Sequence, residues 1–562
     1  MPLLKLSAVL LVLITVAAMA GYEYARYASL STPPQPSMSP VKNKPSPGPI
    51  PIEPPIAGVN YYGRHGAKNV INVFRREEVI EDFARLRADG FNTVVLPLWW
   101  SEFQPDPEPC CRYDEWAFDR LAFLLDQAKK SGLSVVLRID YDEWDNTIWI
   151  YRLLNDERIR QAFFSFLERV EQISHTYSNV RMVFLSREEL RPRVIEARSR
   201  SFFERFLRSL PMDSPQREYP PDRALPVPKG GDANPNLYSA YWDWFLMNEL
   251  YSPAAKRLPM LTFEENIYRS PPEYTNKDGP MLVGSQTTYR PPGANAIVVS
   301  MVPFQTTDPE DLPVSAITLD SFGSALAKAH RYSGGLPILI DQLDFESLSI
   351  SARQTPEGLE NLAYDVACAL HKAGVFGYAY WASQDYAENP VHYPTFAGGL
   401  KGWAMTTNDG TLPRQRLVQR ASGDFDLKLR IGDELEQAVY WKRYPPPGGS
   451  QDKVAANVCV SAITSPSSAV NVSMGAESVH LDFQGGEQEE VCHAISVVIK
   501  DNHNDLRISG INGALTLTSV TMFENFQNGG VYRSDGSVGP WLSELRKLNE
   551  RFSNINKKQN CH

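Results

Sequence analysis

The sequence predicts an α/β chain with a (β/α)8 TIM barrel followed by a smaller all-β sandwich. Eight continuous apolar runs alternate with amphipathic helical stretches, the pattern of a parallel sheet buried on both faces. Most of these runs begin roughly 35 to 50 residues apart, as repeated strand–helix units do. Beyond residue 423 the pattern changes to short stretches in which apolar and polar residues alternate, which is typical of an antiparallel sandwich.

The barrel strands are predicted from the apolar runs alone. They are AGVNYY (57–62), NTVVLPL (92–98), LSVVLRI (133–139), RMVFLS (181–186), PMLTF (259–263), AIVVSMV (296–302), LPILID (336–341) and VFGYAYW (375–381). Between them, apolar residues recur at helical spacing, as in the stripe Val79, Ile80, Phe83 and Leu86. Three helices are followed by a glycine where a C-cap glycine belongs: Gly90, Gly132 and Gly374.

The sandwich strands are predicted from seven alternating stretches. These are FDLKLRI, LEQAVYW, AANVCVSAI, AVNVSM, SVHLDF, CHAISVVI and ALTLTSVTMF. The chain therefore divides into five expected segments: a signal peptide or membrane anchor (1–25), a Pro/Ser-rich linker (26–56), the barrel (57–422), the sandwich (423–526) and a C-terminal tail with a short helix (527–562). A long gap between the fourth and fifth barrel strands holds an insertion at about 191–235, which we expect over the active face.

The N-terminus predicts export. Lys5 precedes an apolar run from Leu6 to Gly21, a length that suits a signal-peptide core better than a full membrane span. Ala18-Met19-Ala20 is a plausible cleavage site, and without cleavage the run would anchor the chain to a membrane. In either case we expect the remainder to lie outside the cytoplasm: periplasmic, cell-surface or secreted.

Composition narrows the class of partner. The 562 residues carry a net charge of −10, which argues against a nucleic-acid binder and is compatible with a neutral or cationic substrate. No Cys or His spacing is typical of zinc, so we expect no metal site and no cofactor. Cys459 and Cys492 lie in two sandwich strands and either pair or are small buried hydrophobes.

Polar and aromatic residues gather where the predicted barrel strands end. Reacting groups of such barrels cluster at the carboxyl ends of the strands, and sugars are held there by aromatic faces together with carboxylates and amides. The candidate substrate-binding residues are Tyr61, Trp99, Trp100, Arg138, Asp140, Tyr141, Asp142, Arg187, Glu264, Gln342, Trp381 and Asp385. The tryptophans among them are equally compatible with plain core positions.

These strand ends resemble the clan A glycoside hydrolases, a superfamily of retaining (β/α)8-barrel enzymes. The resemblance covers roughly residues 57–420 and is carried by GVNYY, PLWWSEFQP, LRIDYDEW, YWASQDY and GLKGWAMTTNDG. It implies a glycosidase with two catalytic carboxylates. It also implies a carbohydrate substrate.

The resemblance places the general acid/base at the end of the fourth strand. Glu188 falls at the expected position, Glu189 is one step off, and Arg187 stands where the family has Asn. The nucleophile is expected at the end of the seventh strand, where the family register falls on Gln342. An amide cannot form a glycosyl ester, so this position departs from the family.

Three interpretations of this departure remain open. The nucleophile is Asp341 or Asp344, at a shifted strand end; or water attacks directly between more widely spaced carboxylates. In the third, the domain binds sugar without cutting it. The sequence thus predicts an exported glycoside hydrolase acting on a polysaccharide or oligosaccharide, with a non-hydrolytic carbohydrate-binding protein of polysaccharide assembly as the alternative.

Overall fold

The computed structural model describes most of the chain from residue 55 onward. The described ranges are 55–65, 70–105, 112–141, 152–153, 155–186, 200–221, 237–268, 281–282, 286–301, 319–345, 361–384, 389–440, 453–464, 467–498, 503–524, 530–533 and 536–554. The predicted leader (1–25) and most of the linker (26–56) lie outside these residues, as does much of the predicted insertion. Within the described part of the chain, no helix is both long and apolar enough to cross a membrane.

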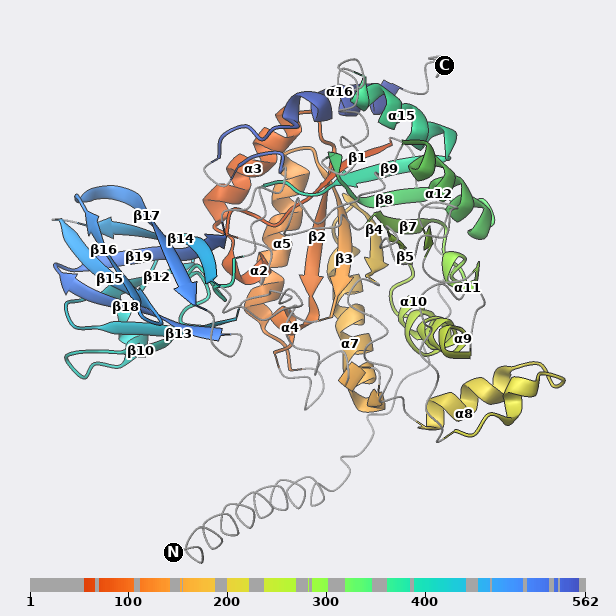
Figure 1. Ribbon diagram of the computed structural model, residues 1–562, viewed down its shortest axis with the longest axis horizontal. Coiled ribbons are helices and arrows are strands. Elements are labelled where there is room, and N and C mark those ends of the chain that lie inside the picture. Colours follow the sequence, from red (N-terminus) through yellow and green to blue (C-terminus); the bar gives the residue numbers. More distant parts are fainter. Residues whose placement is uncertain are drawn as a thin grey trace, which may run out of the picture. The chain divides into compact units, whose positions relative to one another are not determined.

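Eight parallel strands close into a barrel (Figure 1). They are β1 (Ile56–Asn60), β2 (Thr93–Trp99), β3 (Ser134–Asp140), β4 (Val180–Leu185), β5 (Leu261–Tyr268), β7 (Ile297–Met301), β8 (Ile338–Leu343) and β9 (Val375–Tyr380). The closing contacts join β1 to β9 and β4 to β5, and the short strand β6 (Met281–Leu282) adds to β5 in the antiparallel sense. The predicted barrel is therefore confirmed, with each strand within about three residues of its predicted bounds except β5, which ends five residues beyond them.

The helices cover the outside of the barrel. The longer ones are α3 (Arg76–Ala88), α5 (Glu115–Lys130), α7 (Glu157–Ser174), α12 (Leu319–Tyr332) and α15 (Leu362–Lys372). Asp114 and Asp156 cap α5 and α7 by accepting a backbone N–H two residues on. In α3, Val79, Phe83 and Leu86 face the strands, but Ile80 is 45% exposed and does not belong to the predicted stripe.

Shorter helical pieces lie in the connections between the barrel strands. They are α2 (Val70–Val73), α4 (Trp100–Phe103), α8 (Arg200–Ser209), a 3-10 turn (Pro215–Glu218), α9 (Leu237–Phe245), a π-helical stretch (Leu246–Tyr251), α10 (Ser252–Ala255) and α11 (Gln286–Tyr289). Helix α8 and the turn after it fall within the predicted insertion at 191–235. Phe203 and Phe206 of α8 pack edge-on against Tyr241 of α9, so aromatic contacts join this part of the insertion to the outer apolar layer of the barrel.

The predicted C-cap glycines adopt the left-handed conformation that ends a helix. Gly90, Gly132 and Gly374 have φ angles of 89°, 71° and 71°. A side chain is strained at such angles, so glycine at these three positions lets each helix stop and the chain turn into the next strand.

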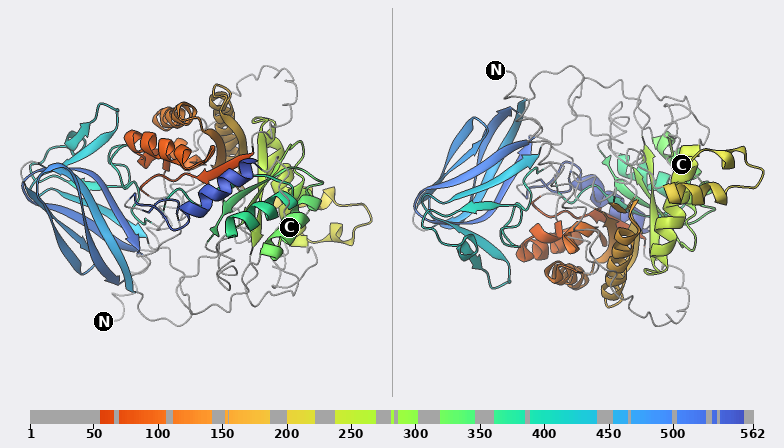
Figure 2. Two further views of the ribbon diagram at one scale, coloured as in Figure 1. Left: turned by 90° about the horizontal axis from the view of Figure 1, so that it is seen from above. Right: turned by 90° about the horizontal axis from the view of Figure 1, so that it is seen from below.

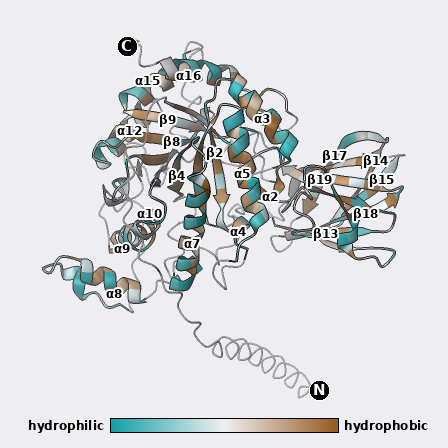
Figure 3. Cartoon of the chain, turned by 180° about the vertical axis from the view of Figure 1, so that it is seen from behind, coloured by the Kyte–Doolittle hydropathy of each residue, from teal (hydrophilic) through white to brown (hydrophobic). Residues whose placement is uncertain are grey.

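Hydrophobic residues form separate cores in the two domains. In the barrel, one apolar layer lies between strands and helices, and a smaller one fills the barrel interior. Figure 3 shows the brown strands enclosed by helices whose outer faces carry hydrophilic residues. The sandwich has a core of its own, built from residues such as Val458, Ile508 and Leu517.

Two antiparallel five-stranded sheets form the sandwich. One has the order β10 (Ala404–Thr406), β13 (Glu434–Tyr440), β18 (His503–Asn512), β15 (Ser468–Met474) and β16 (Glu477–Phe483). The other has the order β11 (Leu417–Gln419), β12 (Phe425–Leu429), β19 (Leu515–Glu524), β14 (Lys453–Thr464) and β17 (Gly486–Val498). The seven predicted strands are present, and β10, β11 and β18 add to them.

A disulfide bond joins Cys459 of β14 to Cys492 of β17. The two residues are directly opposite one another in the β14–β17 ladder, with their Cα atoms 4.0 Å apart. Of the two possibilities that the sequence left open for these cysteines, the structure has the pair.

The C-terminal helix α16 (Leu542–Asn554) belongs to the barrel. It packs on α15 and contacts β1, and Figures 1 and 2 show it among the barrel helices, away from the blue sandwich strands. Asn549 accepts a hydrogen bond from the Tyr378 hydroxyl of β9 and donates to the Asp89 carbonyl at 3.1 Å. In sequence, the sandwich therefore lies between the eighth barrel strand, β9, and α16, a helix that packs on the barrel.

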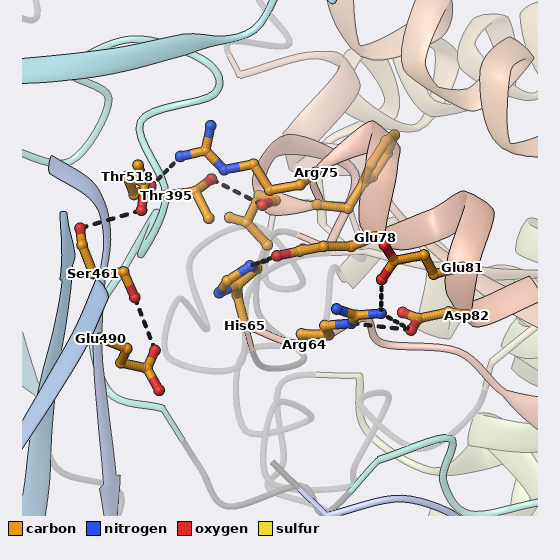
Figure 4. Close-up of polar contacts among 12 residues, drawn as sticks. Arg64, His65, Arg75, Glu78, Glu81, Asp82, Thr395, Ser461, Glu490 and Thr518 are labelled. Atoms are coloured by element: carbon orange, nitrogen blue, oxygen red, sulfur yellow. Dashed lines mark hydrogen bonds and ion pairs between the residues drawn. The ribbon is translucent and has the colours of Figure 1, made fainter. Parts of the chain in front are cut away.

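Buried polar contacts connect the barrel to the sandwich. Arg75, immediately before α3, donates to the Asp426 carboxylate of β12 at 2.9 Å and to the Thr518 carbonyl of β19. Thr395 donates to the Val73 carbonyl at 2.8 Å (Figure 4). Because Arg75 and Asp426 are both about 95% buried in their side chains, this junction is a packed interface.

Candidate active site

The alternation of side chains along the strands decides which residues face the barrel interior. The interior apolar layer contains Val95, Val136, Phe184, Val298 and Leu339. Since strand side chains alternate, the residues two or four positions farther along the chain face the same way. These residues are Asn60, Trp99, Arg138, Asp140, Ser186, Ser300 and Asp341. Glu264 also faces the interior, because its neighbour Phe263 belongs to the outer apolar layer. A polar layer therefore lies above the apolar layer, at the carboxyl ends of the strands.

Asp341 is the centre of this polar layer. It is fully buried at the end of β8 and accepts a hydrogen bond from the Asn60 side-chain amide at 2.8 Å. The Arg138 guanidinium lies 3.4 Å from its other oxygen. In both contacts an N–H group donates to the carboxyl group, so both stabilise Asp341 in its carboxylate form.

Arg138 joins Asp341 to the other carboxylates of the layer. Its Nε donates to Asp140 at 3.0 Å, and its Nη2 donates to the Ser186 hydroxyl at 3.1 Å. Ser186 in turn donates to Glu264 at 2.8 Å. A continuous chain of contacts therefore runs from β8 through β3 and β4 to β5, and it brings together acidic side chains that are far apart in the sequence.

The end of β8 bulges at Gln342. Ile340 and Leu343 pair with Tyr378 and Tyr380 of β9, so β8 has one residue more than β9 between these pairs. Gln342 has a φ of 60°, which is unusual for a residue with a side chain, and its amide oxygen accepts from Ser300 at 2.8 Å. Asp341 faces the interior by regular alternation from Leu339, and the bulge lets the next residue, Gln342, contact Ser300 of β7.

Three buried polar atoms at the carboxyl ends of the strands have no hydrogen-bond partner in the described part of the chain. They are Asn60 Oδ1, Trp99 Nε1 and Ser383 Oγ. Asn60 uses its amide N–H for Asp341, and Ser383 donates its backbone N–H to the Asn60 carbonyl at 2.8 Å. Native proteins leave few buried polar groups unpaired, so such a group at a candidate site indicates a place for a ligand's polar atoms.

Trp381 follows β9 and packs against Tyr62, which follows β1. Their rings meet edge-to-face with centroids 4.9 Å apart, and with Ala382 they form a small apolar cluster. The Trp381 backbone N–H donates to the Leu343 carbonyl at 2.9 Å, and the Trp381–Ala382 peptide bond is cis. Aromatic side chains therefore border the polar layer at the junction of β9 and β1.

Three residues predicted to bind substrate lie elsewhere. Tyr61 donates its hydroxyl to Asp82 of α3 at 3.0 Å; Trp100 and Tyr141 both pack on Phe163 of α7. All three side chains belong to the apolar layer between strands and helices. Each of the three is one residue out of step with an interior-facing neighbour, so its side chain points away from the polar layer, and its role in substrate binding stays a prediction.

The remaining predicted residues divide into two groups. Trp99, Arg138, Asp140, Glu264, Asp341 and Gln342 lie in the polar layer or its bulge, Trp381 lies at its border, and Asp344 is buried one residue beyond β8. The others, Asp142, Arg187, Glu188, Glu189 and Asp385, lie outside the described residues. The acid/base assignment of Glu188 accordingly stays a prediction.

Sequence reasoning missed Asn60, Ser186 and Ser300 as members of the layer. Neutral side chains at strand ends carry no charge signal, so they did not stand out beside the acids. Their spacing was the available signal: each lies two or four residues beyond an interior-facing position of its own strand.

A separate ion-pair cluster lies between the loop after β1 and α3 (Figure 4). His65 contacts Glu78 at 2.9 Å, and Arg64 contacts Asp82 at 2.7 Å. Burial alone would raise the pKa of Glu78, but the nearby His65, Arg64 and Arg75 outweigh burial and lower it. This cluster fixes the loop to α3 and is distinct from the polar layer inside the barrel.

Among the described residues, one group of side chains has the spacing of metal ligands. It consists of Cys459, Glu490 and Cys492 in the sandwich. The two sulfur atoms of this group are joined in the disulfide, so they are not thiolate ligands in this structure.

Comparisons with known proteins give distant matches. No family model matches the sequence, and neither does any curated protein. Among solved structures, the chain is similar to an exo-β-1,4-mannosidase from Opitutaceae bacterium strain TAV5, with 15% identity and a TM-score of 0.37 over 59% of this chain and 52% of that one. The match thus spans about half of the mannosidase.

Two further solved structures give matches of the same quality. A GH5_18 protein from Streptomyces cattleya, in complex with GlcNAc, has 16% identity and a TM-score of 0.37 over 59% of this chain and 71% of that one. A GH5_18 protein from Bifidobacterium longum subsp. infantis has 14% identity and a TM-score of 0.38 over 58% and 69%. Similarity at this level does not transfer function.

Proposed function

We propose that the protein is a glycoside hydrolase whose reaction takes place at the polar layer of the barrel. The observation that carries the proposal is the fully buried Asp341 carboxylate, held by Asn60 and Arg138 at the carboxyl end of β8. In (β/α)8 barrels, this end of the strands is where chemistry occurs. An ionised carboxylate fixed by two donors suits either a nucleophile or a base that activates water.

Glycoside hydrolysis also needs a carboxyl group that stays protonated until it serves the leaving group. We propose Glu188 for this role, because the family resemblance places the acid there. The support from the structure is indirect: Ser186, two residues earlier, directly follows β4, and its hydroxyl lies between Arg138 and Glu264. Glu264 is the second choice for the acid.

The substrate class follows from the unpartnered groups and the aromatic border. Asn60 Oδ1 is an acceptor, Trp99 Nε1 is a donor, and Ser383 Oγ is both, which matches the hydroxyl groups of a sugar ring. Trp381 and Tyr62 supply an apolar surface suited to the CH face of a sugar. We therefore propose a polysaccharide or oligosaccharide substrate.

The test compares matched variants on a panel of plant, fungal and bacterial polysaccharides. Release of reducing sugar should fall by at least about a hundredfold in Asp341→Asn and in Glu188→Gln, because each loses a group that acts in the transition state. Asp126→Asn on the exposed face of α5 is the control and should match the wild type. Full turnover by a folded Asp341→Asn variant would exclude Asp341 from the chemistry.

A non-hydrolytic carbohydrate-binding protein is the second candidate, and Gln342 favours it. The family register places the nucleophile at this residue, yet Gln342 is an amide that accepts from Ser300. Under this proposal, soluble glycans raise the melting temperature through binding, and no product forms. Turnover of any glycan by the wild type, lost in Asp341→Asn, would decide against it.

We also propose that the chain is exported, held by its N-terminal segment where this is not cleaved. The apolar run Leu6–Gly21 behind Lys5 supports this proposal, and so does the Cys459–Cys492 disulfide, since disulfides persist in oxidising compartments. Fusing residues 1–56 to a reporter should export the reporter from the expressing cell. Replacing Leu10, Leu11 and Leu13 with charged residues should retain it, whereas retention of the unmodified fusion would contradict the proposal.

A further inference from the structure

We propose that residues 530–533 and 536–539, together named here the return turn, position Trp381 at the candidate site and that Tyr532 anchors them. This inference rests on the proposed function, because it treats Trp381 as a wall of the sugar-binding site. The return turn lies between the last sandwich strand and α16, more than 100 residues from Trp381 in sequence. Its role is therefore not apparent from the strand-end pattern.

The return turn pairs with the backbone directly after Trp381. Val531 donates its N–H to the Ala382 carbonyl at 3.0 Å, and Tyr532 donates to the Ser383 carbonyl at 3.1 Å. A parallel bridge joins Tyr532 to Gln384. The return turn thus acts as a further short strand beside the end of β9.

The same short stretch is held on its other side by the barrel. Ser383 donates to the Asn60 carbonyl at 2.8 Å, and Trp381 donates to the Leu343 carbonyl at 2.9 Å. Asn60 is the residue that binds Asp341, and Leu343 is two residues from it. The backbone that carries Trp381 is therefore fixed between β1 and β8 on one side and the return turn on the other.

Tyr532 connects the return turn to α3 on the outside of the barrel. Its hydroxyl donates to the Asp89 carboxylate, which is also bound by Arg546 of α16 at 2.9 Å. The Arg85 guanidinium lies 3.8 Å from the centre of the Tyr532 ring and donates to the Gly536 carbonyl at 2.6 Å. Because the ring is buried among these groups, its loss leaves the turn without a fixed support.

Close packing at Gly539 allows a second substitution that tests the return turn independently of Tyr532. A Cβ atom on Gly539 would lie 1.9 Å from the Gly530 carbonyl oxygen and 2.7 Å from that of Val531. Both are backbone atoms that cannot move aside as a flexible side chain does. Gly539→Ala therefore displaces the strand-like stretch at Val531 without touching the Tyr532 ring or the barrel strands.

The first measurement reports on Trp381 without any assay of activity. The full chain is labelled with 5-fluorotryptophan, and the fluorine resonance of Trp381 is identified by its loss in Trp381→Phe. We expect this resonance to shift or broaden in Tyr532→Ala and in Gly539→Ala. In Tyr532→Phe, which keeps the ring, it should stay near the wild-type position. Tyr251→Phe, which removes a buried hydroxyl on the opposite side of the barrel, is the matched control and should leave it unchanged.

The second measurement is kinetic. Tyr532→Ala should raise KM about tenfold with kcat within about twofold, because a displaced wall weakens substrate binding while Asp341 stays in place. An unchanged Trp381 resonance in folded Tyr532→Ala and Gly539→Ala proteins would overturn the proposal. If the wild type turns over no glycan, the proposed function fails, whereas the fluorine measurement still decides whether the return turn positions Trp381.

Discussion

Arg120 of α5 donates to the Asp424 carboxylate at 2.8 Å, although 304 residues separate the two in sequence. Both side chains are buried, and the Arg120 guanidinium also lies over the Phe74 and Trp116 rings. Burial lowers the pKa of Arg120 to about 9, against the opposing effect of Asp424. The pair therefore joins the two domains through a contact from which water is excluded.

Breaking this pair from one side should destabilise the protein strongly. Asp424→Asn leaves the buried guanidinium without a counter-charge and should lower the free energy of unfolding by about 3 kcal/mol in urea denaturation. Glu436→Gln, which removes an exposed partner of Arg507, is the control and should cost less than about 1 kcal/mol. The double variant Arg120→Met/Asp424→Leu should recover much of the loss, because it buries no charge. A double variant less stable than Asp424→Asn would contradict this account.

Leu545 of α16 should contribute to the stability of the barrel. The side chain is fully buried in the layer between strands and helices, so Leu545→Ala should cost about 2 to 5 kcal/mol of unfolding free energy. Lys547→Ala, on the exposed side of the same helix, should change stability by less than about 0.5 kcal/mol. Equal effects of the two changes would show that α16 is not part of the barrel core.

Glu78 should make stability depend on pH in the acidic range. Its pKa is lowered in the folded chain, so its ionised form contributes stability above the unfolded pKa of 4.5, and this is lost as pH falls through the lower folded pKa. Urea midpoints of the wild type and Glu78→Gln should therefore differ at neutral pH and converge in acid. The exposed neighbour Glu77, changed to Gln, should give no such convergence. A constant gap between wild type and Glu78→Gln at every pH would refute the prediction.

Gln342→Glu should not create a better enzyme. The change restores the residue type that the family register expects, but it places a second acid in the buried bulge beside Asp341. Like charges in such a site disfavour each other's ionised form, so glycan turnover should fall and the melting temperature should drop. Gln342→Met, of similar size without charge, separates the electrostatic effect from loss of the Ser300 contact. A severalfold rise in glycan turnover by Gln342→Glu would contradict this prediction and would show that position 342 can supply the nucleophile.

The sequence predicted the barrel well because its strands are buried on both faces. Such strands are continuous apolar runs, so their lengths and spacing can be read from the sequence without knowing which elements they contact. Strand β18 was missed for the opposite reason. One of its faces is exposed, so its apolar residues are few: Leu506 and Ile508 on the buried face, and the exposed Ile511.

The candidate site was only partly predictable. Arg138, Asp140, Glu264 and Asp341 were predicted from strand ends, since charge at such a position is conspicuous, and the structure places all four in the polar layer. Their roles in binding and catalysis stay predictions. Tyr61, Trp100 and Tyr141 were predicted at the same strand ends, but their side chains lie between strands and helices, because one residue of offset reverses the direction of a strand side chain. A bulge such as the one at Gln342 changes this offset, and the sequence does not record it.

The sequence by itself determined the eight strands, the second domain and the set of acids available for chemistry, because these depend on local patterns of apolar and charged residues. Only the tertiary structure decided that Asp341 contacts Asn60 and Arg138, that α16 completes the barrel, and that the return turn pairs with the stretch after Trp381. These are contacts between residues hundreds of positions apart. They depend on how elements pack, and a local pattern specifies an element's type but not its neighbour.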